Sequence, residues 1–334
     1  MSNSLGILGR LGENFATELD APSTSLNITD LELMAQWCNS SYQVLSRDEK
    51  TDYIWRYLVP EEAVAHPFLM HGILAVSAIH LSRIKDDHRR SIYTNLAVAH
   101  QNQALALFRT LLGDINDSNA KAMFAFASVV VLYTFGFPHE SEPSDPFASI
   151  DDLYQTIVLT RGVQQVINKV SASLRDSSFS PLFQVKDNEH FLQEDARLAL
   201  EELLEANRSC GAHNELHDTE AYEDTIYKLI DMMGRIQQDL NSMTIAGRWA
   251  IRVKAKYVEL VRDHDPLALV ILSYFCAMLH CLCRLGRHWC LDNWSFRVSK
   301  AIWMVLDDQW RPLTRWPMMQ VFGQGFLDET FSTT

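Results

Sequence analysis

The chain has 334 residues, and its 29 lysines and arginines against 42 aspartates and glutamates give a formal net charge of −13. Hydrophobic residues make up 47% and charged residues 21%, which excludes an intrinsically disordered chain. The acidic balance argues against broad binding to nucleic-acid phosphates, and 13 glycines with 10 prolines are too few for an all-β fold or for Gly-rich nucleotide-binding loops.

The first 27 residues have a weak hydrophobic pattern and are predicted to be a leader. They contain no basic segment followed by a sustained apolar one, so no secretory signal is expected. A helix is expected to begin near Asn27 to Asp30, and Pro60 and Pro67 are each expected to open a helix, because a proline ring is tolerated in a first turn. Apolar periodicity predicts helices over residues 68–84, 91–112 and 119–135.

An acidic, proline-rich loop is predicted over residues 138–146. Helices are predicted beyond it over residues 150–170, 192–205, 222–242, 267–285 and 294–306. No strand alternation or internal repeat is evident. The sequence therefore predicts an all-α single large domain of roughly ten helices over residues 28–326, followed by a short tail, 327–334.

Two apolar segments, 122–137 and 267–285, are long enough to compare with membrane-spanning helices. The first is too short to span a bilayer comfortably, and the second carries His280 and Arg284. We expect both to be buried core helices and the chain to have no membrane span.

Six cysteines in a chain without a predicted signal indicate reduced thiols inside a cell, so a cytoplasmic location is expected. Cys276, His280 and Cys283 are spaced to share one helix face and could in principle bind zinc. Their neighbours are mostly leucine, phenylalanine and methionine, and paired C-x2-C motifs are missing, which favours buried core thiols. We therefore predict no metal site and no cofactor.

Several strings resemble a known family when they are taken together. They are Asp30-Leu-Glu-Leu-Met34, residues 66–81, Ala99-His-Gln101, Phe124-Ala-Phe-Ala-Ser128, Arg161-Gly-Val163, Trp310-Arg-Pro312 and Arg315-Trp-Pro-Met318. Over about residues 30–320 the chain resembles the C-terminal regulatory domain of fungal zinc-cluster transcription factors of the sterol-uptake-regulator type. The resemblance implies an all-helical domain around a deep apolar pocket for a sterol-like ligand, and it allows a homodimer.

The family also carries an N-terminal zinc cluster of six cysteines that binds DNA. In this sequence only Cys38 precedes residue 200, so a cluster of six closely spaced thiolates cannot form within it. We expect that this chain does not itself bind nucleic acid.

The segment 247–257 departs from the family pattern by carrying Arg248, Arg252 and Lys254. One interpretation is a solvated basic turn. The other is a cationic rim of the pocket that binds an oxygen anion or polarises a carbonyl group on an apolar ligand. His71 could carry a proton at neutral pH, although hydrogen bonding or capping is the commoner role for such a histidine. These four residues are the candidate catalytic groups.

Large apolar and aromatic side chains are the candidates for contact with a ligand, since they can stack on a flat or polyene molecule. They are Phe68, Met70, Trp249, Tyr257, Phe275, His280, Trp289, Trp294, Trp316 and Met319. The alternative for most of the tryptophans is a place in the hydrophobic core.

Two functions follow. In the first, the pocket binds a bulky apolar natural product, a terpenoid or polyketide, and promotes a cofactor-free cyclisation or Diels–Alder-type (pericyclic) reaction in fungal secondary metabolism. Holding the reacting ends together can contribute about 7–11 kcal/mol without a nucleophile or metal. In the alternative, the chain is the sterol- or lipid-sensing regulatory domain of a zinc-cluster transcription factor and acts in the nucleus. We favour the enzyme, because no DNA-binding segment is evident in the sequence.

Overall fold

The computed structural model describes residues 26–138, 144–184, 192–237, 243–284, 288–291 and 293–325. Every regular element in these ranges is a helix and none of their residues forms a strand, so the predicted all-α class is confirmed. The predicted leader lies outside the described residues except for Leu26 and Asn27, and the predicted tail lies wholly outside them.

The N-terminal half begins where the sequence indicates a helix start. Asn27 Oδ1 accepts a hydrogen bond from the Asp30 amide at 3.2 Å, which caps the first described helix. Asp48 and Thr51 form a reciprocal capping box at α3. The elements of this half are α2 (Ile28–Asn39), η1 (Ser41–Leu45), α3 (Glu49–Tyr53), the π-helical turn η2 (Ile54–Leu58), α4 (Val59–Ala65), α5 (Pro67–Ile84), α6 (Asp87–Leu111) and α7 (Ala120–Gly136).

The C-terminal half contains three helices, α11, α12 and α15, that no predicted range covers. Its elements are α8 (Pro146–Arg175), η3 (Ser180–Phe183), α9 (Glu194–His213), α10 (Thr219–Gln237), α11 (Met243–Arg252), α12 (Ala255–Arg262), α13 (Pro266–Arg284), η4 (Trp289–Leu291), α14 (Trp294–Val305), η5 (Arg311–Thr314) and α15 (Arg315–Phe322). The basic segment interpreted as a possible solvated turn is therefore the end of α11 followed by the start of α12.

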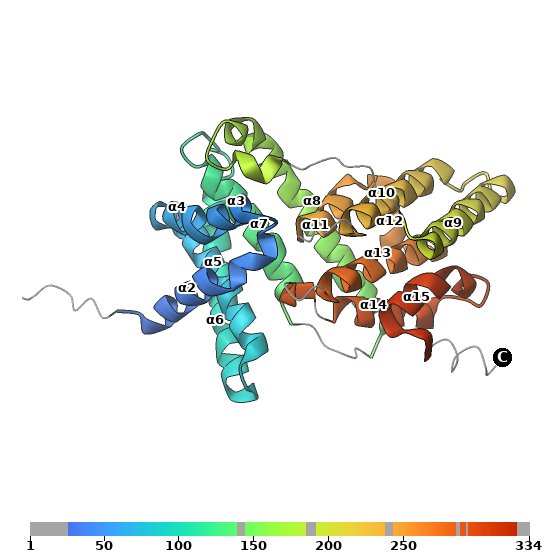
Figure 1. Ribbon diagram of the computed structural model, residues 1–334, viewed down its shortest axis with the longest axis horizontal. Coiled ribbons are helices and arrows are strands. Elements are labelled where there is room, and N and C mark those ends of the chain that lie inside the picture. Colours follow the sequence, from blue (N-terminus) through green and yellow to red (C-terminus); the bar gives the residue numbers. More distant parts are fainter. Residues whose placement is uncertain are drawn as a thin grey trace, which may run out of the picture.

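The helices form two groups joined by α8. Helices α2 to α7 lie on one side, α9 to α15 on the other, and the 30-residue α8 runs between them (Figure 1). Helix α8 packs on α7 in the first group and on α11, α12 and α14 in the second. The long central helix therefore fixes the two groups relative to each other.

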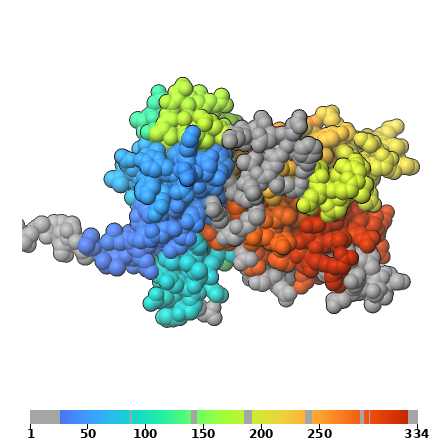
Figure 2. Space-filling model, viewed as in Figure 1, coloured from blue at the N-terminus to red at the C-terminus, as the bar shows by residue number. Residues whose placement is uncertain are grey.

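A small residue on α5 allows a neighbouring helix to approach closely. A Cβ atom added to Gly72 would lie only 2.8 Å from the ring of Phe126 on α7. Figure 2 shows the end of α8 and η3, in yellow-green, against the blue N-terminal helices. Arg47 holds that contact, because its Nη2 donates to the carbonyl oxygens of Pro181 and Leu182, both at 3.0 Å.

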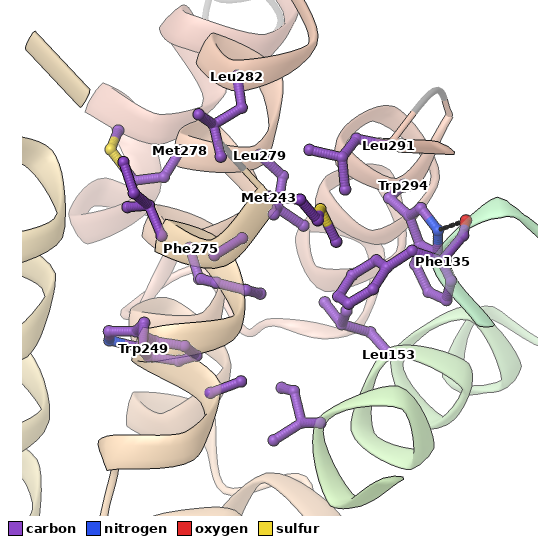
Figure 3. Close-up of a cluster of buried hydrophobic side chains, with 14 of the residues drawn as sticks. Phe135, Leu153, Met243, Trp249, Phe275, Met278, Leu279, Leu282, Leu291 and Trp294 are labelled. Carbon is purple, nitrogen blue, oxygen red and sulfur yellow. Dashed lines mark hydrogen bonds between the residues drawn. The ribbon is translucent and has the colours of Figure 1, made fainter. Parts of the chain in front are cut away.

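Helix α13 is the centre of the core on the second side. Phe275 stacks on Trp249 of α11 with ring centroids 4.3 Å apart, and Trp294 Nε1 donates to the Phe135 carbonyl at 2.8 Å (Figure 3). Helices α5 and α13 are long and apolar enough to cross a membrane by length and composition, but 72% and 78% of their apolar windows are buried inside the protein. The prediction that segment 267–285 is a buried core helix fits the burial of α13.

Candidate ligand-binding cleft

A cleft of about 1020 Å³ opens between the N-terminal group of helices, α8 and α11. Segments far apart in the sequence form its walls: η1 and the start of α3, then α7, α8, η3, the end of α10 and α11. The lining residues are Leu45, Arg47, Asp48, Glu49, Lys50, Phe124, Ser128, Val131, Thr160, Val163, Gln164, Ile167, Pro181, Leu182, Phe183, Gln184, Arg235, Met243, Thr244, Ile245, Gly247, Arg248, Ile251 and Arg252.

The apolar wall of the cleft is formed by residues at helical spacing on α7 and α8. On α7 the lining residues are four and then three positions apart, and on α8 they recur at i, i+3, i+4 and i+7, so each set shares one helix face. The polar members bond within their own helices: Ser128 Oγ donates to the Phe124 carbonyl at 3.1 Å, Thr160 Oγ1 donates to the Thr156 carbonyl at 2.8 Å, and Gln164 Nε2 donates to Asn168 Oδ1 at 2.6 Å. This wall therefore presents mainly carbon to the cleft.

Helix α11 presents two adjacent stripes to the cleft. The first is apolar or small and contains Met243, Gly247 and Ile251 at i, i+4 and i+8. The second is polar, one position further along, and contains Thr244, Arg248 and Arg252 with the same spacing. A ligand against α11 would contact hydrocarbon along one side and guanidinium groups along the other.

Positive charge is concentrated at the cleft although the chain as a whole carries −13. Among the described lining residues, five are lysines or arginines and two are acidic. On α10, the buried Arg235 donates its Nε to Asp231 Oδ1 at 3.0 Å, and Arg252 Nη1 donates to Asp231 Oδ2 at 3.0 Å. One carboxylate therefore lies between two guanidinium groups at the α10–α11 end of the cleft.

The candidate catalytic residues are not gathered into one site. Arg248 and Arg252 line the cleft. Lys254 is half-exposed and forms an ion pair with Glu220. His71 lies on α5, where its Nδ1 is 2.9 Å from Nδ1 of His100 on α6. Neither Lys254 nor His71 is among the residues that line the cleft.

None of the ten predicted ligand-contact residues lines this cleft. Five of them, Phe68, Trp249, Tyr257, Phe275 and Trp294, are buried in the core. Of the others, Trp289 stacks on His80, His280 packs edge-on against Phe296, Trp316 stacks on Tyr274, and Met70 and Met319 are half-buried. Their contact with a ligand stays a prediction.

Sequence reasoning missed Phe124, Val163, Ile167 and Leu182 as cleft residues. Apolar positions on a periodic helix look the same whether they face a core or a cleft, so periodicity alone could not identify them. A signal was nevertheless present, because Phe124 and Val163 lie within two of the strings that carry the family resemblance.

The cysteine–histidine stripe on α13 is not arranged as a metal centre. Within the described ranges, no group of three or more His, Cys, Asp or Glu side chains is placed to hold a metal ion. Cys276 is buried, and burial raises the pKa of its thiol to about 12, so it remains protonated at neutral pH. His280 Nδ1 instead lies 3.3 Å from Ser295 Oγ of α14.

Residues 38–182 match the family described as the fungal specific transcription factor domain. The predicted resemblance is confirmed. The matched residues supply the η1–α3, α7 and α8 walls of the cleft and part of η3, whereas α10 and α11 lie beyond them. The cleft is therefore completed by a part of the chain outside the domain match.

Two curated proteins called sterol uptake control protein 2 are also similar to the chain. The protein of Saccharomyces cerevisiae is 31% identical over 121 residues, which are 36% of this chain and 13% of that protein. The protein of Candida albicans is 32% identical over 130 residues, 38% of this chain and 18% of its own length. A Zn(2)-C6 fungal-type transcription factor of Gibberella zeae is 22% identical over 309 residues, 86% of this chain and 61% of that protein. The chain thus covers less than two thirds of each of these relatives.

Proposed function

We propose that this chain is a ligand-binding regulatory domain of a fungal transcription factor and that the cleft binds a bulky apolar molecule of the sterol class. The cleft itself carries the proposal, because about 1020 Å³ walled mainly by carbon is at the upper end of the range for small-molecule sites, about 300–1,000 Å³. Similarity to two proteins named for control of sterol uptake supports the ligand class.

Regulation would follow from the way the cleft is assembled. A ligand between α7, α8 and α11 contacts segments more than 100 residues apart in the chain, so it stabilises their packed arrangement. At a free concentration 100 times its dissociation constant, such a ligand stabilises the folded state by about 2.7 kcal/mol. A regulator of this kind acts in the nucleus, and a homodimer stays a prediction.

No observation favours the cyclisation hypothesis over this proposal. The matched family and the three relatives carry the names of regulators. Of the four candidate catalytic groups only the two arginines of α11 line the cleft. A cationic group in an apolar cleft also serves ligand binding, so these arginines do not by themselves point to a reaction.

Binding of a fluorescent sterol, dehydroergosterol, to the full chain tests the proposal. Val163 lines the cleft, so Val163→Trp should fill part of it and weaken binding at least tenfold. Val158 lies on the same helix, is 39% exposed and does not line the cleft, so Val158→Trp should bind as the native chain does. Mass spectrometry of the recovered sterol should show no chemical change. Equal binding by the native chain and Val163→Trp would place the ligand elsewhere and contradict the proposal.

A further inference from the structure

We infer that the ligand of the cleft carries an acidic oxygen group at one end, held by the arginines of α10 and α11. Within the sterol-like class, the ligand is therefore an amphipathic monocarboxylic acid with a large apolar body, such as a steroid acid, which binds more tightly than a neutral sterol. This inference rests on the proposed function, because it assigns the chemistry of a ligand bound in the same cleft.

The first support is the separation of apolar and charged surface within the cleft. The α7 and α8 walls present Val131, Val163 and Ile167, and the apolar stripe of α11 adds Ile251. The charged groups Arg248 and Arg252 occupy the neighbouring stripe of α11, and Arg235 approaches from α10. A ligand that is apolar along its body and anionic at one end matches this division.

The second support is the way the arginines are held. Asp231 accepts one hydrogen bond from Arg235 and one from Arg252, which fixes both guanidinium groups beside the cleft. A guanidinium has five N–H donors, so one bond to Asp231 uses only a fraction of the capacity of Arg252. The Arg252 side chain is 44% exposed, so it contacts Asp231 and also reaches the cleft.

A neutral hydroxyl would be a poor partner for this end of the cleft. An apolar body that enters the cleft removes water from the arginines beside it, and a charged group that loses water is destabilised unless an opposite charge replaces that water. A carboxylate supplies the opposite charge and accepts paired N–H bonds from a guanidinium, whereas a single hydroxyl offers neither. Arg252, whose bond to Asp231 uses one of its five N–H donors, therefore favours an acid.

Arg47, on the opposite wall, has a different role. Its two hydrogen bonds to the carbonyl oxygens of Pro181 and Leu182 hold η3 against the N-terminal helices, and burial lowers the pKa of its guanidinium. We assign it to the structure of the wall and not to the binding of the acid.

The probes for the test are lithocholic acid and its methyl ester, which share one steroid body and differ in the charge of one end. Displacement of dehydroergosterol from the full chain at low ionic strength should show the acid binding at least tenfold more tightly than the ester. The double variant Arg248→Gln, Arg252→Gln should remove this preference, so that the dissociation constants of acid and ester differ by less than twofold. Lys254 is a nearby cation that pairs with Glu220 and does not line the cleft, so Lys254→Gln is the matched control and should keep the preference.

A second variant makes the charge at this end of the cleft more positive, whereas the double variant makes it less positive. Asp231→Asn removes the carboxylate that lies between the two arginines, so it should increase the preference for the acid over the ester. Equal affinity of the native chain for acid and ester would overturn the inference while leaving the proposed function intact. A preference for the acid that survives in the double variant would overturn the assignment to these arginines. Failure of both probes and of dehydroergosterol to bind would overturn the inference and the proposed function together.

Discussion

Arg161 of α8 donates a hydrogen bond from its Nη1 to the carbonyl oxygen of Val253, the residue directly after α11. The same nitrogen lies 3.2 Å from the carbonyl oxygens of Ala250 and Ile251. The last carbonyls of a helix lack partners within the helix and carry partial negative charge, so a cation at this end is favourable. Arg161 thereby fixes α11, which carries Arg248 and Arg252, to α8, which forms part of the apolar wall.

Removal of the Arg161 side chain should loosen α11. Hydrogen bonds to a charged group contribute about 1.5–3 kcal/mol, so Arg161→Met should lower the free energy of unfolding by about that amount. It should also speed hydrogen exchange of the α11 amides and weaken dehydroergosterol binding. Arg175 is an exposed arginine on the same helix, and Arg175→Met should change stability by less than about 0.5 kcal/mol. Exchange in α11 that is unchanged in Arg161→Met would show that the arginine does not hold this helix.

Two helix glycines should respond to alanine with opposite signs. At Gly72 an added Cβ would lie 2.8 Å from the Phe126 ring and 3.3 Å from Val129 Cγ1, so Gly72→Ala should overpack the α5–α7 contact and destabilise the fold by about 1–3 kcal/mol. Nothing lies within 4 Å of the Cβ position of Gly162 on α8, so Gly162→Ala should stabilise it by about 0.5–1 kcal/mol. Urea unfolding of both variants measures the difference, and a shared sign would contradict the packing argument.

His80 should make folding stability depend on pH. Its ring stacks on Trp289 with centroids 4.3 Å apart, and its Nδ1 lies 2.9 Å from Ser41 Oγ. Burial, with a further contribution from the Arg83 charge, lowers the pKa of His80 from 6.5 to about 4. In the unfolded chain the imidazole takes up a proton near pH 6.5, but in the folded chain only near pH 4. The contribution of neutral His80 to the free energy of unfolding is therefore complete above about pH 6.5. About 3 kcal/mol of it is lost as the pH falls to 4.

Comparison with His80→Gln isolates this effect. Burial also lowers the pKa of His100 and of His280, so the native profile contains their contributions in the same direction. The difference in unfolding free energy between native and variant should shrink by about 3 kcal/mol as the pH falls from 7 to 4. Parallel profiles over this range would mean that His80 takes up its proton equally in both states.

The ion pair between Arg297 and Asp152 should stabilise the contact of α14 with α8. Arg297 is 8% exposed, and its Nη1 donates to Asp152 Oδ2 at 2.7 Å. Asp152→Ala leaves this guanidinium buried without that carboxylate, so it should lower the free energy of unfolding by about 3 kcal/mol. This value is the lower end of the range for buried pairs, and we choose it because the Asp152 side chain is 41% exposed. The double variant with Arg297→Met should lose less than the sum of the two single losses in thermal or urea unfolding. Additive losses would show that the two side chains do not interact.

Residue types identified only a small part of the candidate site, and they did not identify its walls. The sequence singled out Arg248 and Arg252 because they depart from the family pattern, and both line the cleft. Val163 and Ile167 were not identified, because the helical spacing of an apolar residue does not indicate whether a neighbouring helix covers it. The sequence favoured Trp249 and Phe275 as ligand contacts, yet these two rings stack on each other in the core.

Helices α7 and α13 could be predicted from the sequence alone, since a helix that is apolar nearly all round must be buried. Helices α11 and α12 could not, because they are 10 and 8 residues long and short helices are marginal without tertiary partners. The bond from Arg161 to the end of α11 joins residues about 90 positions apart, and no local pattern encodes it. Local spacing thus determined the helices and the stripes on α11, whereas the cleft exists only because distant helices pack there without filling the space between them.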